Sequence, residues 1–243
     1  MNHSPNALVR RLSNVTHLNA KQVRDLDHLC RDVRRTAAKQ DIIREGERTE
    51  HVHLIVEGWA ASYKVLPDGS RQILSFLIPG DFCDLHVSLL DGIDHGIVAL
   101  SPCKVAYIES SAIDALAARD DRLARALCWT TLVDEGVLRT WIANVGRREA
   151  YERIAHLLCE VYDKMKLVGL VQHHKLPLPL TQADLADATG LTAVHVNRVL
   201  QRLRSASLIQ LAHGSLTVPD LPALARAGGF TANYLHAKRH LLD

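Results

Sequence analysis

The stretch from Leu180 to Leu211 constrains this chain most, because it has the pattern of two short helices joined by a tight turn. Thr181 is placed as a helix N-cap, and Asp184 stands three residues later, where a capping-box acid reaches back to the cap. Gly190 ends the first helix, because a residue without Cβ accepts the left-handed conformation of a sharp turn. Thr192 caps the second helix. Its apolar stripe recurs at helical spacing and comprises Val196, Val199, Leu200 and Leu203. The pattern predicts a helix-turn-helix.

The outer face of the second helix is polar, with Arg and Asn side chains that suit guanine edges, adenine edges and phosphates. Its outward residues are Val194, Asn197, Arg198, Gln201 and Arg202. Behind this helix, residues 208–211 and 215–218 flank Ala212-His213-Gly214 in the pattern of a β-hairpin. A hairpin in this place predicts a winged helix-turn-helix, with the second helix in the major groove and the wing on the backbone. The alternative is an ordinary helical hairpin within a core, which leaves the polar face unexplained.

Length and composition set the remaining bounds. With 243 residues, of which 47% are hydrophobic and 23% charged, the chain is expected to form two soluble globular domains. No apolar run approaches the ~20 residues of a membrane span, and MNHSPNALVRR lacks the apolar core of a secretory signal. Five scattered cysteines indicate a reducing cytoplasm. The net charge is only +2, with six Lys and Arg against four Asp from Leu180 onward, so DNA binding must depend on local arrangement.

The first half of the chain predicts helices followed by a small β-barrel. Residues 1 to about 40 have a helical pattern, whose apolar face comprises Leu12, Leu18, Val23, Leu26, Leu29 and Val33. From Asp41, short β segments are separated by glycine-containing turns. The candidate strands are 42–43, 53–56, 59–63, 73–76 and 104–108. Many short strands within ~70 residues indicate a barrel or jelly roll, and the whole chain is predicted to be α+β.

A long helix is predicted from about Asp121 to Asn144, after a short helix over 114–119. Alternating steps of four and three along it form a coiled-coil-like seam, which we assign to a dimer interface. The seam comprises Leu123, Leu127, Thr130, Asp134, Val137, Trp141 and Asn144. The second apolar face is expected to pack on the barrel and comprises Leu132, Val133, Leu138 and Ile142. The alternative is one amphipathic helix that covers only its own domain.

A hinge is predicted over 146–149, followed by a helix through Val161. Residues 167–178 are expected to form a loop or a short strand pair before the helix-turn-helix. The predicted domains are therefore a β-roll with N-terminal helices over 1–119, a dimerisation helix over 120–145, and a winged helix-turn-helix domain over 146–243.

Together these segments resemble the Crp/Fnr family of bacterial transcription regulators, over nearly the whole chain. The motifs that carry the resemblance are Arg44-Glu45-Gly46-Glu47, residues 53–58, Asp68-Gly69, residues 78–82, residues 151–155 and residues 180–203. The resemblance implies a sensory β-roll of the double-stranded β-helix type, similar to a cyclic-nucleotide-binding domain. It also implies a cytoplasmic homodimer that reads a palindromic operator in double-stranded DNA. Activation would add a surface that touches RNA polymerase, and no motif shows whether the protein activates or represses.

The segment that binds cyclic AMP in this family is altered here. Those members use a glutamate for the ribose, and an arginine and a hydroxyl for the charged cyclic phosphate. Leu85 stands at the glutamate position, and His95 and Gly96 stand at the other two. Leu138 and Arg139 replace the hydroxyl pair that meets the adenine. We therefore expect an effector other than cyclic AMP. The candidate effector region comprises Phe82, Cys83, Asp84, Leu85, His86, His95, Gly96, Leu138 and Arg139.

Other known sensor types of the family also fit poorly. An iron–sulfur cluster needs four cysteines, most of them bunched near the N-terminus, and none are bunched here. Haem sensors place a Cys and a His early in the same segment, as Cys83 and His86 are, but at a different spacing, and a small buried Cys is commonly structural. His51 and His53 share a strand face without a suitable third ligand, so no metal site is predicted. Cys83 and Cys103 are candidate redox reporters. The effector stays unidentified.

The DNA-reading residues also depart from the family. Carried over by position, the family's base contacts fall on Ala193, Val194, Asn197 and Arg198, of which Arg198 alone matches. Valine cannot accept from a cytosine amino group as the family's glutamate does, but it packs on a thymine methyl. We therefore expect an altered half-site. The residues expected to contact phosphate are Thr181, Gln182, Thr192 and His195.

Three functions follow in order of preference. The first is a dimeric transcription regulator with a diverged sensory domain. The second is a constitutive DNA-binding protein whose β-roll serves only as a dimer scaffold. The third, an enzyme on a cupin-like barrel, lacks the His and carboxylate cluster and any catalytic triad, so no catalytic residue is predicted.

Overall fold

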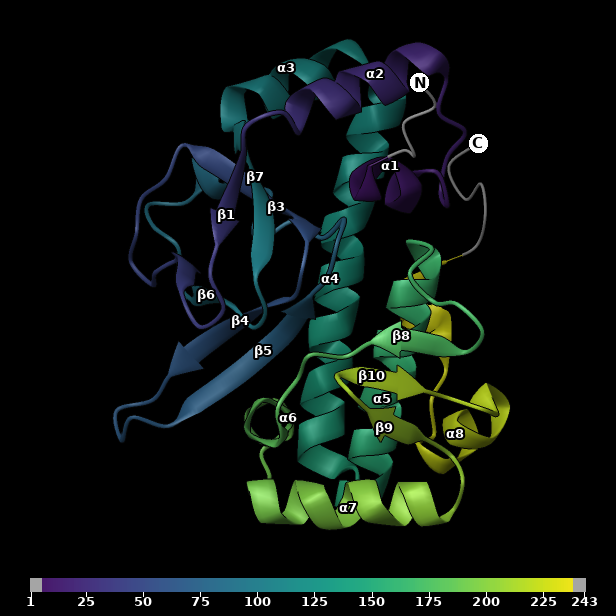
Figure 1. Cartoon of the computed structure of the whole chain (residues 1–243). Coiled ribbons are helices and arrows are strands. Elements are labelled where there is room, and N and C mark those ends of the chain that lie inside the picture. Colours follow the sequence, from purple (N-terminus) through teal and green to yellow (C-terminus); the bar gives the residue numbers. More distant parts are fainter. Residues whose placement is uncertain (1–5, 238–243) are drawn as a thin grey trace. The chain divides into compact units, whose positions relative to one another are not determined.

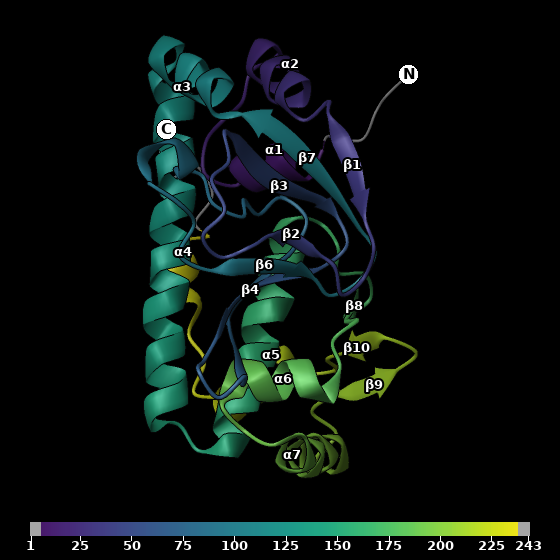
Figure 2. The same cartoon turned by 90° about the vertical axis from the view of Figure 1, so that its left-hand side faces the viewer.

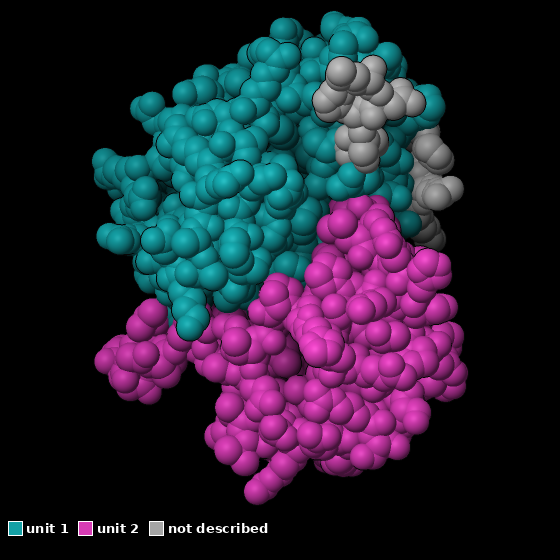
Figure 3. Space-filling view, in the orientation of Figure 1, with its two compact units in different colours: residues 1–64, 76–135, 237–243 teal, residues 65–75, 136–236 magenta. Residues whose placement is uncertain are grey.

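The computed structural model describes residues 6–237, which divide into two compact units (Figures 1 and 3). The first unit holds residues up to 64 and residues 76–135, and the second holds 65–75 and 136–236. The long helix α4 (Asp121–Arg147) contributes to both units. Residues 65–75 belong to the second unit although the chain on either side belongs to the first.

Two antiparallel sheets make the β-roll (Figure 2). One sheet has the order β1-β7-β3 and contains β1 (Val33–Thr36), β7 (Cys103–Glu109) and β3 (His51–Glu57). The other has the order β2-β6-β4-β5 and contains β2 (Asp41–Ile43), β6 (Gly96–Ala99), β4 (Ala60–Val65) and β5 (Arg71–Leu77). Side chains such as Val52, Leu54 and Ile97 from both sheets are fully buried in one hydrophobic core.

Two of these strands correct the sequence-based expectation. Residues 33–36 were expected to continue the N-terminal helix, but they form β1, which pairs with β7 from Val33 opposite Ala106 to Thr36 opposite Cys103. Val33 is 39% exposed and is therefore not part of an apolar helix face. Strand β6 was not expected. Its four residues are all buried between β2 and β4, so its sequence shows no alternation of polar and apolar side chains.

Short helices close the first unit. They are α1 (Ala7–Leu12), α2 (Ala20–Leu29), the 3-10 turn η1 (Val87–Leu89) and α3 (Ser110–Arg119). Helix α1 packs against the turn at Gly80, where an added Cβ would lie 2.8 Å from the carbonyl oxygen of Ala7. Buried Arg11 forms ion pairs with Asp81 of this turn and with Asp134 of α4, the second at 3.4 Å. These contacts attach the N-terminal helix to both the β-roll and the long helix.

The second unit is built around α5 (Ala150–Leu167), in which residues 154–162 are buried on every side of the helix. The other elements are β8 (Lys175–Pro177), α6 (Gln182–Thr189), α7 (Ala193–Ser205), β9 (Gln210–Ala212), β10 (Ser215–Thr217), α8 (Leu221–Ala227) and η2 (Ala232–Leu235). The segment expected to be a loop or strand pair holds β8, and Gln172 and Lys175 form a β-bridge. Helix α4 continues through Gly146 to Arg147, so the predicted hinge reduces to Arg148 and Glu149.

Candidate functional site

The first helix of the helix-turn-helix, α6, is capped as the sequence predicted. The Thr181 hydroxyl accepts a hydrogen bond from the Asp184 amide at 3.1 Å, and the Thr181 amide donates to the Asp184 carboxylate at 2.9 Å. Gly190 follows the helix with φ 64°, a left-handed conformation that glycine adopts without strain. The turn between the two helices is therefore fixed by local chemistry at both ends.

The second helix, α7, presents the predicted faces. Thr192 caps it by accepting from the His195 amide at 3.2 Å, and the predicted apolar stripe is buried. The side chains on the opposite face are exposed. They are Thr192, Ala193, Val194, His195, Arg198, Gln201 and Arg202. Val194 is 63% exposed, so its apolar side chain faces solvent on the outward face of α7.

Two of the outward residues have contacts that the sequence did not indicate. Asn197 is half-buried, and its amide donates to the Gln182 side chain at 3.2 Å, which links α7 to the start of α6. The Arg202 guanidinium lies over the Tyr151 ring at 4.6 Å from its centroid. Such a cation–π contact restrains Arg202 against α5. Neither pair follows from helical periodicity, because the partners lie on different elements.

The wing is a three-stranded antiparallel sheet in the order β8-β10-β9 (Figure 1). The predicted hairpin is present, with Ser215 opposite Ala212 and Thr217 opposite Gln210. His213 and Gly214 both have positive φ, 49° and 68°, as expected for a two-residue hairpin turn of type I′. Strand β8 adds to the other edge of β10, with Leu176 opposite Leu216.

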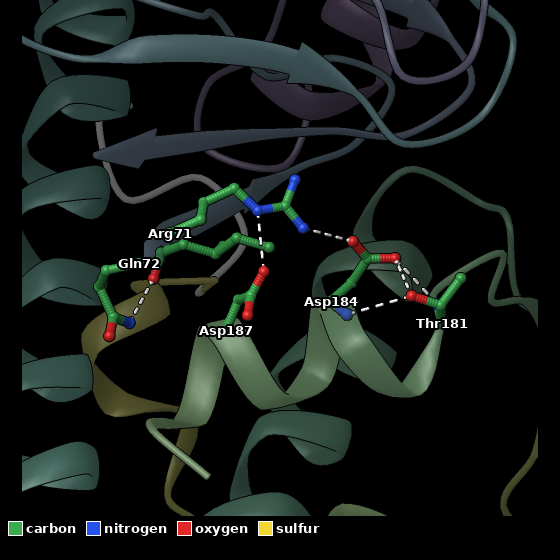
Figure 4. A network of polar contacts seen from close by, with 6 residues as sticks. Arg71, Gln72, Thr181, Asp184 and Asp187 are labelled. Atoms are coloured by element: carbon green, nitrogen blue, oxygen red, sulfur yellow. Dashed lines mark hydrogen bonds and ion pairs between the residues drawn. The ribbon is translucent and has the colours of Figure 1, made fainter. Parts of the chain in front are cut away.

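An ion-pair network on α6 was missed from the sequence (Figure 4). Arg71 donates to Asp187 at 2.8 Å through Nε and to Asp184 at 2.9 Å through Nη2. Asp184 also accepts from the Thr181 hydroxyl at 2.6 Å, so one carboxylate serves both the cap and the ion pair. The arginine lies more than a hundred positions earlier in the chain, and no local pattern connects it with α6. It offsets the charge of both acidic residues of the helix-turn-helix.

The structure overturns the predicted dimer seam on α4. Six of its seven residues are at most 6% exposed within one chain, and these are Leu123, Leu127, Thr130, Val137, Trp141 and Asn144. The seventh, Asp134, pairs with Arg11. The Trp141 indole donates to Glu160 at 2.8 Å, and the Asn144 amide donates to the Arg153 carbonyl at 3.2 Å. These side chains are held by their own chain and are not available to a second copy.

The face that was expected to pack on the barrel is largely exposed instead. Val133 is buried, but Leu132, Leu138 and Ile142 are 52%, 43% and 74% exposed. Helix α4 has apolar residues on two sides, and the sequence did not show which side is buried by its own chain. Three of the four residues that were expected to pack on the barrel are therefore exposed.

Most of the candidate effector region lies in the first unit. Phe82 and Cys83 are buried, Asp84, Leu85 and His95 are half-buried, and His86 is exposed with Nε2 3.1 Å from the Thr131 hydroxyl. Leu138 and Arg139 lie on the part of α4 that belongs to the second unit.

The surroundings of His95 are poorly suited to bind a cyclic phosphate. His95 Nδ1 lies 2.8 Å from Asp94, and this hydrogen bond lowers the pKa of the Asp94 carboxyl. Gly96 is covered by Tyr63, since an added Cβ would lie 2.5 Å from the tyrosine ring. A carboxylate and a packed aromatic ring thus occupy the surroundings of the position where cyclic-AMP-binding members place a cation and a hydroxyl.

Two cysteines and one histidine of the β-roll, Cys83, Cys103 and His53, are buried. Burial raises the pKa of the Cys83 and Cys103 thiols, which disfavours the reactive thiolate. His53 is 3% exposed, contacts the Tyr107 ring at 4.4 Å between centroids, and has its pKa lowered to about 4 by burial. His51 instead lies 3.1 Å from Glu109. Within residues 6–237 there is no cluster of three or more His, Cys, Asp or Glu suited to a metal ion.

These features define the class of the protein: a winged helix-turn-helix protein that also carries a β-roll of the sensory type. Across the described part of the chain, every helix is too short or too polar to span a bilayer. Comparison with known proteins extends the assignment. Residues 33–120 match the model of the cyclic nucleotide-binding domain, and residues 152–227 match the Crp-like helix-turn-helix domain.

Similar proteins match over most of their length. The nitrogen fixation regulation protein FixK of Bradyrhizobium diazoefficiens is 28% identical over 211 residues, 86% of each chain. The transcriptional activatory protein AadR of Rhodopseudomonas palustris is 28% identical over 87% of each chain. The solved structure of FixK2 from Bradyrhizobium japonicum has a TM-score of 0.70 and 26% identity, and covers 80% of this chain and 96% of that one. The chain belongs to the Crp/Fnr family of transcription regulators.

Proposed function

We propose that the protein is a homodimeric regulator that binds a palindromic operator in double-stranded DNA through α7. The observation that carries this proposal is the exposed face of α7, which follows the Gly190 turn and the Thr192 cap, with Arg198 and Val194 exposed one helical turn apart on it. Arg198 suits a guanine edge, and Val194 suits a thymine methyl. Thr181, Gln182, Thr192 and His195 lie at helix starts, where amides and hydroxyls meet phosphates.

The dimer is proposed to form through the exposed stripe of α4. Its members follow steps of four and three along the helix, the spacing of a two-stranded coiled coil. They are Cys128, Leu132, Glu135, Arg139, Ile142 and Gly146. Two of them, Leu132 and Ile142, are large apolar side chains that are exposed to solvent in the isolated chain. A second copy of α4 would bury them, which supports this stripe over the seam derived from the sequence.

The effector is proposed to differ from cyclic AMP. Leu85 stands where the ribose glutamate would be, His95 is paired with Asp94, and Gly96 is packed under Tyr63, so the family's arginine and hydroxyl for the cyclic phosphate are both replaced. The cysteines are scattered, which argues against an iron–sulfur cluster, and burial raises the pKa of Cys83, which makes it a poor haem ligand. The alternative remains a constitutive regulator, in a reducing cytoplasm, whose β-roll is a dimer scaffold. RNA polymerase would be a partner if the protein activates transcription.

Selection from a randomised duplex library with the purified full chain tests the proposal. We expect an enriched palindrome whose half-sites lie one helical turn apart, and binding by two chains per duplex. Recovery of no sequence preference at low and moderate salt, without additives and with cyclic nucleotides, haem or thiol oxidants, would refute a sequence-specific regulator. Tight binding without any additive would favour the constitutive alternative.

A further inference from the structure

A pocket of about 290 Å³ lies within the second unit, apart from the DNA-binding face. Its lining comes from four segments: α4, the link before α5, α5 itself, and residues 231–236 around η2. Arg139 and Thr140 line it from α4, Arg148 from the link, and Asn233 from η2. The pocket thus lies where the long helix passes into the domain that carries the helix-turn-helix.

The floor of this pocket is aromatic and rigid. His156 and Tyr234 line it and stack at 6.2 Å between ring centroids. The Tyr234 hydroxyl donates to the buried Glu160 carboxylate at 2.7 Å, and the Trp141 indole donates to the other oxygen at 2.8 Å. Both oxygens of Glu160 are therefore engaged below the floor, and burial raises the pKa of this carboxyl.

The charge of the lining points to an anionic ligand. Of the described residues that line the pocket, Arg139 and Arg148 carry positive charge and none carries a carboxylate. Arg148 engages Asn144 through one N–H group, at a long 3.4 Å. A guanidinium has five donors in a planar fork, which matches carboxylate and phosphate oxygens. The Asn233 amide adds a neutral donor on the opposite wall.

We propose that this pocket binds a small dianion, either a dicarboxylate or a phosphate group, between Arg139 and Arg148. The volume equals that of about ten water molecules at roughly 30 Å³ each. It lies just below the range of roughly 300–1,000 Å³ for larger organic ligands, so the ligand is small. The bound anion joins η2 and the end of α4 to Arg148, and stiffens the link before α5. This inference does not depend on DNA binding by α7; it uses Arg139, which also lies on the α4 stripe proposed for the dimer.

Thermal unfolding of the full chain tests the proposal, with inorganic phosphate, succinate, or sodium chloride at matched ionic strength. We expect a saturable rise in Tm with at least one dianion, roughly 3–6 °C at ten times its Kd, and none with chloride. A rise with phosphate alone assigns a phosphate-bearing ligand, and a rise with succinate alone assigns a dicarboxylate. No rise with either dianion would overturn the proposal.

Two variants separate this pocket from anion binding elsewhere, including the DNA-binding face. Arg148→Ala removes a guanidinium, and Asn233→Asp keeps the acceptor for the Thr231 hydroxyl while it adds a negative charge. We expect each to weaken dianion binding at least tenfold. Arg147→Ala is the matched control, because this neighbouring exposed arginine is not among the lining residues. If Arg148→Ala binds as tightly as the control, the site lies elsewhere and the proposal fails.

Discussion

Helices α7 and α4 both carry large exposed apolar side chains, yet the sequence determined the faces of only one. In α7, Val194 is exposed and a single apolar stripe is buried, as the spacing indicated. In α4, Ile142 and Leu132 are exposed, while the stripe that was assigned to a dimer seam is buried in its own chain. Periodicity identifies the buried face of a helix that has one apolar stripe. When a helix has two apolar stripes, periodicity does not tell which of them its own chain buries.

The helix-turn-helix and α4 differ in the contacts that determine their conformation and buried faces. The helix-turn-helix is set by caps and a turn glycine within a dozen residues, and all of these are visible locally. The faces of α4 are set by distant partners, such as Arg11 for Asp134 and Glu160 for Trp141. Substitutions should therefore have different consequences in the two regions.

The two faces of α4 should respond in opposite ways to shortening a side chain. Leu123→Ala removes a fully buried side chain from the core of the first unit and should cost about 2–5 kcal/mol of unfolding free energy at any protein concentration. Ile142→Ala changes an exposed side chain and should leave the unfolding free energy of the monomer almost unchanged, while it weakens the dimer. Chemical denaturation and sedimentation measure the two quantities.

If Leu123→Ala weakens the dimer without loss of unfolding free energy, the original seam is right and the structure-based stripe is wrong. Leu132→Ala serves as a second test of the stripe, since it lies ten positions before Ile142 on the same exposed face. It should behave as Ile142→Ala does.

Features set by local chemistry could be predicted from the sequence, and features set by distant partners could not. The capping box at Thr181, the turn at Gly190 and the wing turn at His213-Gly214 use residue types with strong local preferences, and all were predicted. Strand β1 was missed because its pairing partner lies some seventy residues away, and β6 because a strand buried on both faces has no alternation. The Arg71 network has no local signal at all. The candidate effector residues were placed by family resemblance, and their chemistry is still a prediction.

Stability should also depend on pH through His53, which β3 and β7 bury together. Burial, with Arg34 and His51 nearby, lowers the pKa of His53 to about 4, and Nδ1 has no hydrogen-bond partner among the described residues. The unfolded chain therefore binds more protons between pH 6.5 and 4, so folding loses stability as pH falls through this window. The loss from this group is about 3 kcal/mol at most.

Denaturation from pH 7 to pH 4, compared between the parent protein and His53→Phe, measures this contribution. The aromatic replacement keeps the contact with Tyr107 but cannot be protonated. Its unfolding free energy should fall less steeply with decreasing pH than that of the parent. Equal slopes would show that His53 does not contribute.

A substitution on the exposed face of α7 should change DNA binding alone. Arg198→Ala should cost about 1–3 kcal/mol of binding free energy and relax preference at one base pair if Arg198 reads a base. Because Arg198 is exposed, its loss should not change the unfolding free energy. Arg226→Ala, on the exposed surface of α8, is the control for a general loss of charge. Unchanged affinity and preference would remove Arg198 from the base-reading set.

Substitution of Arg71 should affect both the unfolding free energy and the affinity for DNA. Arg71→Ala leaves Asp184 and Asp187 without their cation, and should cost about 1 kcal/mol of unfolding free energy because the pair is only partly shielded from water. It should also weaken DNA binding, since two uncompensated carboxylates on α6 then repel phosphates. Arg71→Ala combined with Asp187→Asn restores part of the balance and should recover affinity without a new contact to DNA. If the double variant binds DNA no better than Arg71→Ala, the ion pair supports only the fold of α6, and its charge has no effect on the operator.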